Sequence, residues 1–168
     1  MNAEEIIKFL NLKPHPEGGF FLETYRSDEA YEKKSLPERY DGDRSYGTAI
    51  YYMLTADTFS VMHRLKSDEI FHFHMGDSVE MLILPPEGKG RGQIITMGHD
   101  IKSGEKLQVM VPRDYWQGMR LKDGGKYALF GTTVAPGFEY SDYEESKCEP
   151  LAKKYPEFTD MIKKLTRG

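Results

Sequence analysis

The sequence predicts an all-β fold of antiparallel strands with a short helix at each end. Between residues 20 and 134, apolar and polar side chains alternate with the two-residue period of a half-buried strand. Clusters of Gly, Pro, Asp and Ser separate these stretches, and strands at such short spacing are typical of a β-sandwich or β-barrel. The predicted strands cover residues 20–26, 46–54, 58–64, 69–75, 79–84, 92–97, 107–111, 116–121 and 126–134.

Two segments outside the strands have helical spacing. Near the N-terminus, Asn2 is a suitable N-cap, and Glu4 and Glu5 lie in the first turn, where the helix dipole favours negative charge. Residues 149–165 return to helical periodicity, and Pro156 suits the first position of a helix. We therefore expect a short helix at each end of the strand region.

Residues 27–45 are polar and charged, and they interrupt the strand pattern. Long ordered loops are uncommon without a purpose, so a lid or a dimer contact is one interpretation of this segment. A solvated loop is the interpretation that we favour. No repeat, low-complexity tract or linker divides the chain, which predicts one domain over residues 1–168.

The composition is that of a soluble globular protein and argues against several classes of function. There are 23 Lys and Arg against 27 Asp and Glu, a net charge of −4 that favours neither nucleic acid nor an anionic membrane surface as a partner. No apolar run reaches the ~20 residues that span a bilayer. Residues 1–12 lack the features of a signal peptide, and the single Cys148 excludes an intrachain disulfide. We therefore expect a cytoplasmic protein.

Residues 63–76 (HRLKSDEIFHFHMG) contain three of the five histidines and a glutamate. Histidine and carboxylate side chains together bind metals or perform acid–base chemistry near neutral pH. From His63 it is two residues to Leu65 and four more to Glu69, and Gly76 follows seven residues later. This spacing resembles the first motif of the cupin superfamily, in which two histidines precede a glutamate and a glycine. Leu65 departs from it, because it stands at the second histidine.

A second segment, residues 112–117 (PRDYWQ), resembles the second cupin motif. Pro112 stands at the proline of that motif, whereas Asp114 stands at its glycine and Gln117 at its histidine. The segment lies about 40 residues after the first motif, on a predicted hairpin, where the second cupin motif is expected.

The resemblance extends over roughly residues 5–165. The chain is similar to a branch of small, single-domain cupins that has been labelled a domain of unknown function. This resemblance implies a cupin-type antiparallel β-barrel, also called a double-stranded β-helix or jelly roll, similar in fold to sugar-nucleotide epimerases and germin-type seed proteins. It also implies a homodimer in which residues 20–26 cross between subunits. The matching segments are HPEGGF (15–20), ETYR (23–26), TAIYYML (48–54) and TVAPGFEYSDYE (133–144).

Side-chain alternation divides the strand that carries Glu69 into two faces. Phe71 and Phe73 share the face of Glu69, whereas His72 and His74 take the opposite face. If Glu69 points into the barrel, the two phenylalanines line the same cavity and the two histidines are structural. If the faces are reversed, His72 and His74 replace Glu69 in the pocket.

The candidate catalytic residues are His63 and Glu69, because a carboxylate that accepts a hydrogen bond from an imidazole orients it and strengthens it as a base. Gln117 converges on them from a neighbouring strand. Trp116 is a further candidate for ligand contact, with barrel packing as the competing interpretation.

Two more residues are candidates for ligand contact at the barrel mouth. Tyr25 and Arg26 can reach an anionic ligand there, or they form an ion pair at a strand edge. His15 lies in a proline-flanked turn and is interpreted as a surface residue.

We expect the pocket to work without a tightly held transition metal. If a metal were present, its ligands would be His63, Glu69 and Gln117, a set with a single imidazole that suits a weakly bound divalent cation. The resemblance implies an isomerase or epimerase that acts on a carbohydrate-like or sugar-nucleotide ligand, with His63 as the base. The alternatives are a non-catalytic protein that binds a small ligand and a metal-dependent oxidase or dioxygenase.

Overall fold

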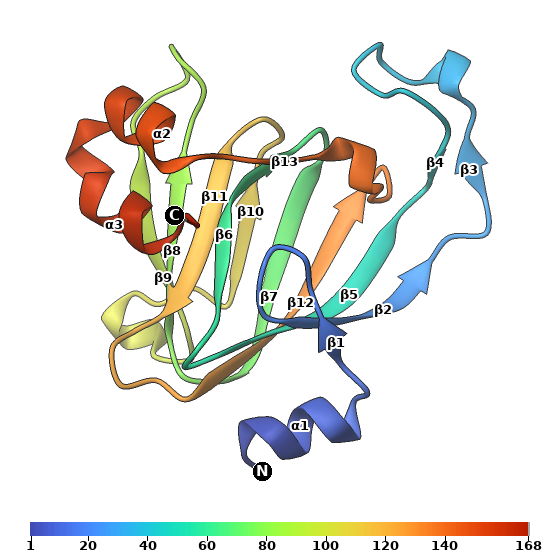
Figure 1. The fold of residues 1–168 in the computed structure, drawn as a ribbon. Coiled ribbons are helices and arrows are strands. Elements are labelled where there is room, and N and C mark those ends of the chain that lie inside the picture. Colours follow the sequence, from blue (N-terminus) through green and yellow to red (C-terminus); the bar gives the residue numbers. More distant parts are fainter. Residues whose placement is uncertain (168) are drawn as a thin grey trace.

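The computed structural model describes residues 1–167 and shows two antiparallel β-sheets that face each other (Figure 1). The predicted fold class is confirmed, and each predicted strand is present with its ends within two residues of the prediction. The first sheet has the order β1 (Lys13–Pro14), β2 (Phe20–Arg26), β5 (Thr48–Thr55), β12 (Tyr127–Ala135), β7 (Asp68–Gly76) and β10 (Gln108–Val111). The second has the order β13 (Tyr143–Glu145), β6 (Phe59–Leu65), β11 (Trp116–Leu121), β8 (Val79–Leu84) and β9 (Gln93–Met97).

The main core lies between the inner faces of the two sheets. On β7, Glu69, Phe71 and Phe73 are buried, whereas His72 is half-buried and His74 is exposed. Glu69 therefore lies on the inner face, as strand alternation predicts. Phe71 and Phe73 pack into this core among other apolar side chains of both sheets.

Helices cover the outer faces of the sheets (Figure 1). At the N-terminus, α1 (Ala3–Phe9) begins at a capping box in which Asn2 and Glu5 bond each other's backbone N–H, and its Ile6 packs on the first sheet with Met53 and Leu129. At the other end, α2 (Cys148–Lys154) and α3 (Thr159–Lys164) pack on the outer face of the second sheet. Three-residue 3-10 helices cover Lys33–Ser35, Ile101–Ser103, Tyr140–Asp142 and Pro156–Phe158.

The segment 27–45 is largely exposed, as the solvated-loop interpretation predicts, but it is also anchored to the barrel near its end. It contains the short strands β3 (Ala30–Tyr31) and β4 (Arg44–Ser45), and it buries Tyr40 and Arg44 to 1% and 2% exposure. The guanidinium of Arg44 donates to both carboxylate oxygens of Asp142, at 2.7 and 2.6 Å. This ion pair joins two parts of the chain that are far apart in sequence, which is why local polarity does not reveal it.

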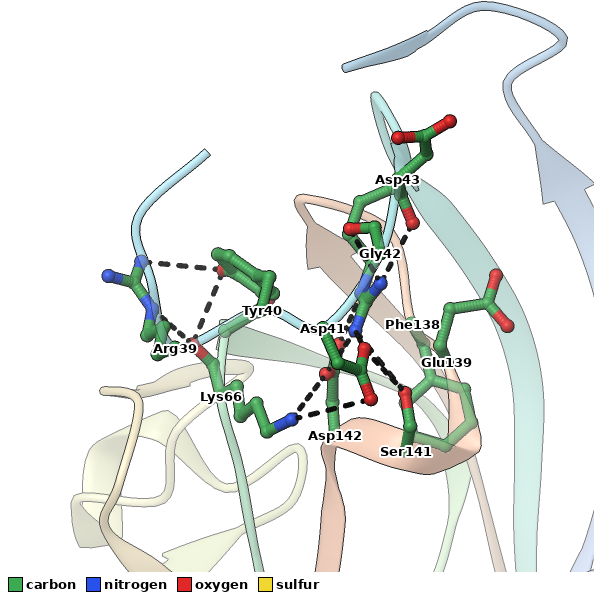
Figure 2. Close-up of polar contacts among 12 residues, drawn as sticks. Arg39, Tyr40, Asp41, Gly42, Asp43, Lys66, Phe138, Glu139, Ser141 and Asp142 are labelled. Carbon is green, nitrogen blue, oxygen red and sulfur yellow. Dashed lines mark hydrogen bonds and ion pairs between the residues drawn. The ribbon is translucent and has the colours of Figure 1, made fainter. Parts of the chain in front are cut away.

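Figure 2 shows Asp41 and Asp142 close together, with Lys66 extending toward them. Arg44 also donates to Asp41 at 2.5 Å, and the ammonium of Lys66 lies 3.4 Å from Asp142. The cluster holds the 27–45 segment against the Tyr140–Asp142 helix. That helix directly follows Phe138 and Glu139, which border the cavity described next.

Candidate functional site

The inner face of the barrel contains a cavity of about 360 Å³, a volume that suits a small organic ligand. Its polar lining includes two imidazole–carboxyl sets, one on the strands and one on the loop between β1 and β2. The strand set is His63 and Glu69, and the loop set is His15 and Glu17. Apolar side chains form the remaining walls, and they include Phe21, Ile50, Leu65, Val134 and Phe138.

His63 on β6 is 2% exposed, and its backbone contacts fix its tautomer. Its Nδ1 lies 2.7 Å from the carbonyl oxygen of Val61, which can only accept, so Nδ1 carries the proton. In the neutral ring, Nε2 then carries a lone pair and can accept a hydrogen bond. Two groups lie 3.3 Å from this atom, the amide nitrogen of Gln117 and a carboxyl oxygen of Glu17. Burial lowers the pKa of His63, and the Glu69 carboxylate opposes that effect. The ring is therefore suited to act as a neutral base.

Glu69 has only a neutral hydrogen-bond donor beside it. The amide nitrogen of Gln117 donates to its Oε2 at 2.7 Å, and Gln117 lies opposite His63 in the β6–β11 register. Burial, followed by the nearby Glu17 carboxylate, raises the pKa of Glu69 to about 7. This carboxyl therefore exchanges its proton near neutral pH, which is the property of a general acid or base.

His15 and Glu17 were missed as site residues by the sequence analysis. The side chains are 8% and 13% exposed, so His15 is not the surface residue that its turn suggests. The backbone N–H of Glu17 donates to Nδ1 of His15 at 3.1 Å, which leaves the ring proton on Nε2. Burial lowers the pKa of His15 and raises that of Glu17. The signal in the sequence was the Gly18–Gly19 pair, which allows a close approach of the backbone.

Arg26 borders the cavity, but its charge is already compensated. Its guanidinium donates to Glu23 at 2.9 and 3.0 Å and to Glu139 at 2.8 Å. It also donates to the carbonyl oxygen of Phe138 at 3.1 Å. The adjacent Tyr25 is 56% exposed and does not line the cavity. Arg26 therefore joins β2 to residues 138 and 139 at the cavity mouth, and its charge is paired with carboxylates.

The remaining predicted contacts lie away from the cavity. Phe71 and Phe73 belong to the core, and neither lines the cavity. On the opposite face of β7, Nδ1 of His72 accepts from Gln108 at 3.1 Å, and the ring of His74 lies 6.0 Å from that of Tyr51.

Trp116 packs against the apolar cluster between the second sheet and the helices α2 and α3, and the guanidinium of Arg64 lies 4.6 Å from the centre of its ring. Of the residues predicted from sequence, the structure therefore brings together His63, Glu69 and Gln117, with Arg26 at the mouth.

The three residues considered as a metal set do not fit a metal centre. Leu65 supplies no donor, and the amide nitrogen of Gln117, rather than its oxygen, faces both His63 and Glu69. Among residues 1–167, no group of three or more His, Cys, Asp or Glu side chains has the arrangement that holds a metal ion.

Comparison with known proteins identifies relatives along the whole chain. The family model described as "Cupin superfamily (DUF985)" matches residues 4–145. The crystal structure of protein SO0799 from Shewanella oneidensis is 34% identical, with a TM-score of 0.86 over 99% of this chain and 98% of that chain. A hypothetical protein from Leishmania major is 30% identical, with a TM-score of 0.87 over 100% of both chains. The uncharacterized protein YML079W of Saccharomyces cerevisiae is 27% identical over 160 residues, or 90% of this chain and 79% of that protein.

No helix within residues 1–167 has the length and apolar character needed to cross a membrane.

Proposed function

The chain belongs to the cupin superfamily, and we propose that its cavity binds a small, uncharged, carbohydrate-like molecule and transfers a proton at it, as an isomerase or epimerase does. The observation that carries this proposal is the pairing of His63 and Glu69 in one cavity. Nε2 of neutral His63 is an acceptor, and burial raises the pKa of Glu69 to about 7. A base and an acid that both work near neutral pH are the requirements of such a reaction.

The charges around the cavity favour a neutral ligand over a sugar nucleotide. Four glutamates line the cavity, and Arg26 is the only arginine or lysine among the lining residues described within 1–167. Because Glu23 and Glu139 already bind Arg26, a diphosphate would face carboxylates without an available cation. A hydroxyl-bearing molecule can instead donate hydrogen bonds to those carboxylates and pack its C–H groups against Phe21 and Phe138.

The mechanism assigns one step to each residue. Nε2 of His63 removes a proton from a carbon beside a carbonyl group, and the electron pair moves onto the carbonyl oxygen. The protonated carboxyl of Glu69 donates a hydrogen bond to that oxygen, which stabilises the developing negative charge. Return of the proton to the neighbouring carbon completes an isomerisation, whereas an epimerisation requires protonation of the same carbon on its opposite face.

The experiment is hydrogen–deuterium exchange into candidate ligands. Neutral aldoses and ketoses are screened beside sugar phosphates and sugar nucleotides by thermal shift, where a ligand at 100 times its Kd adds about 2.7 kcal/mol to the free energy of unfolding. Each hit is then incubated with the protein in D2O, and deuterium at carbon is measured by mass spectrometry.

We expect exchange into a neutral sugar, its loss in His63→Asn, and its retention in His99→Asn, a matched variant at an exposed turn. Binding of neutral sugars without exchange would instead support the non-catalytic alternative. A preference for sugar nucleotides would contradict the proposed ligand class.

Homodimer assembly and a cytoplasmic location also remain proposals. In the structure, β2 pairs with β5 of the same chain along Phe20–Arg26, so any strand crossing must coexist with that pairing. Sedimentation at micromolar concentration tests the assembly, because a species of 19.4 kDa would contradict the dimer.

A further inference from the structure

We propose that Glu17 is the proton partner of His63, and that these two side chains together hold the proton that the cavity exchanges with its ligand. The sequence analysis assigned the partner role to Glu69. The inference deepens the proposed function and rests on it for the ligand's part in the exchange. The shared proton itself belongs to the protein without ligand.

The contacts separate the roles of the two carboxyl groups. Oε2 of Glu17 lies 3.3 Å from Nε2 of His63, the ring atom that faces the cavity. Glu69 reaches the same atom only through the amide of Gln117, whose nitrogen lies 2.7 Å from Glu69 and 3.3 Å from His63. Glu17 is therefore the carboxyl that meets the base directly.

The tautomer of His63 allows a proton to lie between the two groups. Because Nδ1 donates to the Val61 carbonyl, Nε2 of the neutral ring is an acceptor, and the Gln117 amide nitrogen and a Glu17 oxygen both lie 3.3 Å from it. An ionised carboxylate has no proton to donate to this lone pair, so the Glu17 contact is a hydrogen bond when the proton lies on Glu17 or on Nε2. Burial raises the pKa of Glu17 and lowers that of His63, and this combination favours the first arrangement while keeping the second accessible.

Two glycines in the loop between β1 and β2 allow this loop to place Glu17 at this position. Gly18 has a φ of +106°, and a Cβ there would lie 2.0 Å from the carbonyl oxygen of Phe59. At Gly19, with a φ of +72°, a Cβ would lie 2.5 Å from the carbonyl oxygen of Met53. Only glycine allows so close an approach to the strand backbones.

Hydrogen bonds to both sheets then hold the loop in place. The backbone N–H of Val61 donates to the carbonyl of Glu17 at 2.9 Å, and the hydroxyl of Tyr52 donates to that of Gly18 at 2.8 Å. On the other side of the carboxyl group, the Ser60 hydroxyl donates to Oε1 of Glu17 at 3.3 Å. Hydrogen bonds from β5 and β6 therefore fix the position of the loop that carries Glu17.

Several other titratable or charged groups surround the pair and affect the protonation of His63 and Glu17. His15 lies 3.9 Å from Glu17. The ring of Tyr143 stacks on His63 at 5.2 Å between centroids, and Glu69 and Glu145 favour the charged form of His63. Arg167 favours the charged form of Glu17 from the loop side, where it donates to the Pro16 carbonyl.

A ligand-free NMR titration tests the pairing. Ring ¹⁵N and ¹³C signals of His63 are followed against pH in the unmodified chain and in Glu17→Gln, Glu69→Gln and Glu23→Gln. The last variant removes a carboxylate from the same cavity at its mouth. In the unmodified chain, the Nε2 signal should shift in one step when the pair takes up its shared proton, and in a second step at lower pH when the ring becomes fully protonated. We expect Glu17→Gln to lose the first step, because the amide cannot take up that proton, and we expect Glu69→Gln and Glu23→Gln to keep both steps.

The Gly18 and Gly19 amide signals report whether the loop keeps its position in each variant. If Glu17→Gln displaces the loop, Glu17→Asp is measured instead, since it keeps a titratable carboxyl but shortens the reach to His63 and should also weaken the first step. A first step that persists in Glu17→Gln with the loop in place, or that is lost in Glu69→Gln instead, would overturn the inference. Because no ligand is present, the outcome is independent of whether the proposed sugar chemistry is found.

Discussion

Arg44 and His63 are each 2% exposed and each belongs to a polar cluster, and the segment 138–142 supplies Asp142 to the first cluster and borders the cavity of the second. In the Arg44 cluster, every charge has a partner of opposite sign. Arg44 donates to Asp142, Asp41 and the carbonyl oxygens of Gly42 and Asp43. The guanidinium lowers the pKa of Asp41 to about 2, so this carboxylate stays ionised throughout the physiological range.

The His63 cluster is built in the opposite way. Glu17 and Glu69 are shielded from water, yet their nearest partners are an imidazole, an amide and a hydroxyl. Burial raises the pKa of both carboxyls, and the buried Oε1 of Gln117 has no hydrogen-bond partner. The difference teaches that complete charge pairing stabilises a fold, whereas carboxyls without a cation hold exchangeable protons at a cost in stability.

The largest effect is expected from breaking the Arg44 cluster. Arg44→Met removes the cation and leaves Asp142 buried with only Lys66 nearby, which should lower the free energy of unfolding by about 3–5 kcal/mol in urea denaturation. The matched variant Arg120→Met breaks ion pairs to Glu80 and Asp123 that are more exposed, and should cost about 1 kcal/mol or less. Equal losses in the two variants would show that the Arg44 cluster is not a structural element.

Replacing Glu69 by a neutral side chain should raise the free energy of unfolding at high pH, whereas Arg44→Met lowers it. The pKa of Glu69 rises from 4.5 to about 7 on folding, so the folded state binds more protons between these values. Its favourable contribution is present below pH 4.5 and is lost as pH rises through 7, a change of about 3 kcal/mol. Glu69→Gln should remove this loss and be more stable than the unmodified chain at pH 8.

Urea denaturation from pH 4 to 8 measures the difference, with Glu87→Gln in an exposed turn as the charge-matched control. A Glu69→Gln variant whose stability falls with pH as steeply as that of the unmodified chain would mean that Glu69 is ionised in the fold.

The smallest effect is expected at the cavity mouth. Glu139→Gln weakens the ion pair with Arg26, whose side chains are 45% and 36% exposed, and should change the free energy of unfolding by less than about 1 kcal/mol. Glu144→Gln weakens the similarly exposed pair with Arg64 and should have a similar effect. A much larger loss of stability in Glu139→Gln would show that the ion pairs at the cavity mouth stabilise the fold as the Arg44 cluster does.

Local periodicity was enough to predict the strands and the inner face of Glu69. Alternation places every second side chain of β7 in the same environment, so Glu69, Phe71 and Phe73 had to share one face. Register also explains Gln117, which lies opposite His63 on the neighbouring strand. Spacing cannot tell how far along that face the cavity extends, which is why the two phenylalanines were expected to line it.

The sequence by itself therefore determined the all-β class, the terminal helices and the strand half of the candidate site, because period-two and helical patterns are local properties of the chain. Only the tertiary structure decided that Glu17 reaches His63 and that Arg44 is buried against Asp142. Glu17 lies on a loop without periodicity, and its position depends on contacts with Phe59 and Val61 of a distant strand. A charged side chain in a polar segment predicts exposure unless its partner is known, and the partner of Arg44 lies 98 residues away.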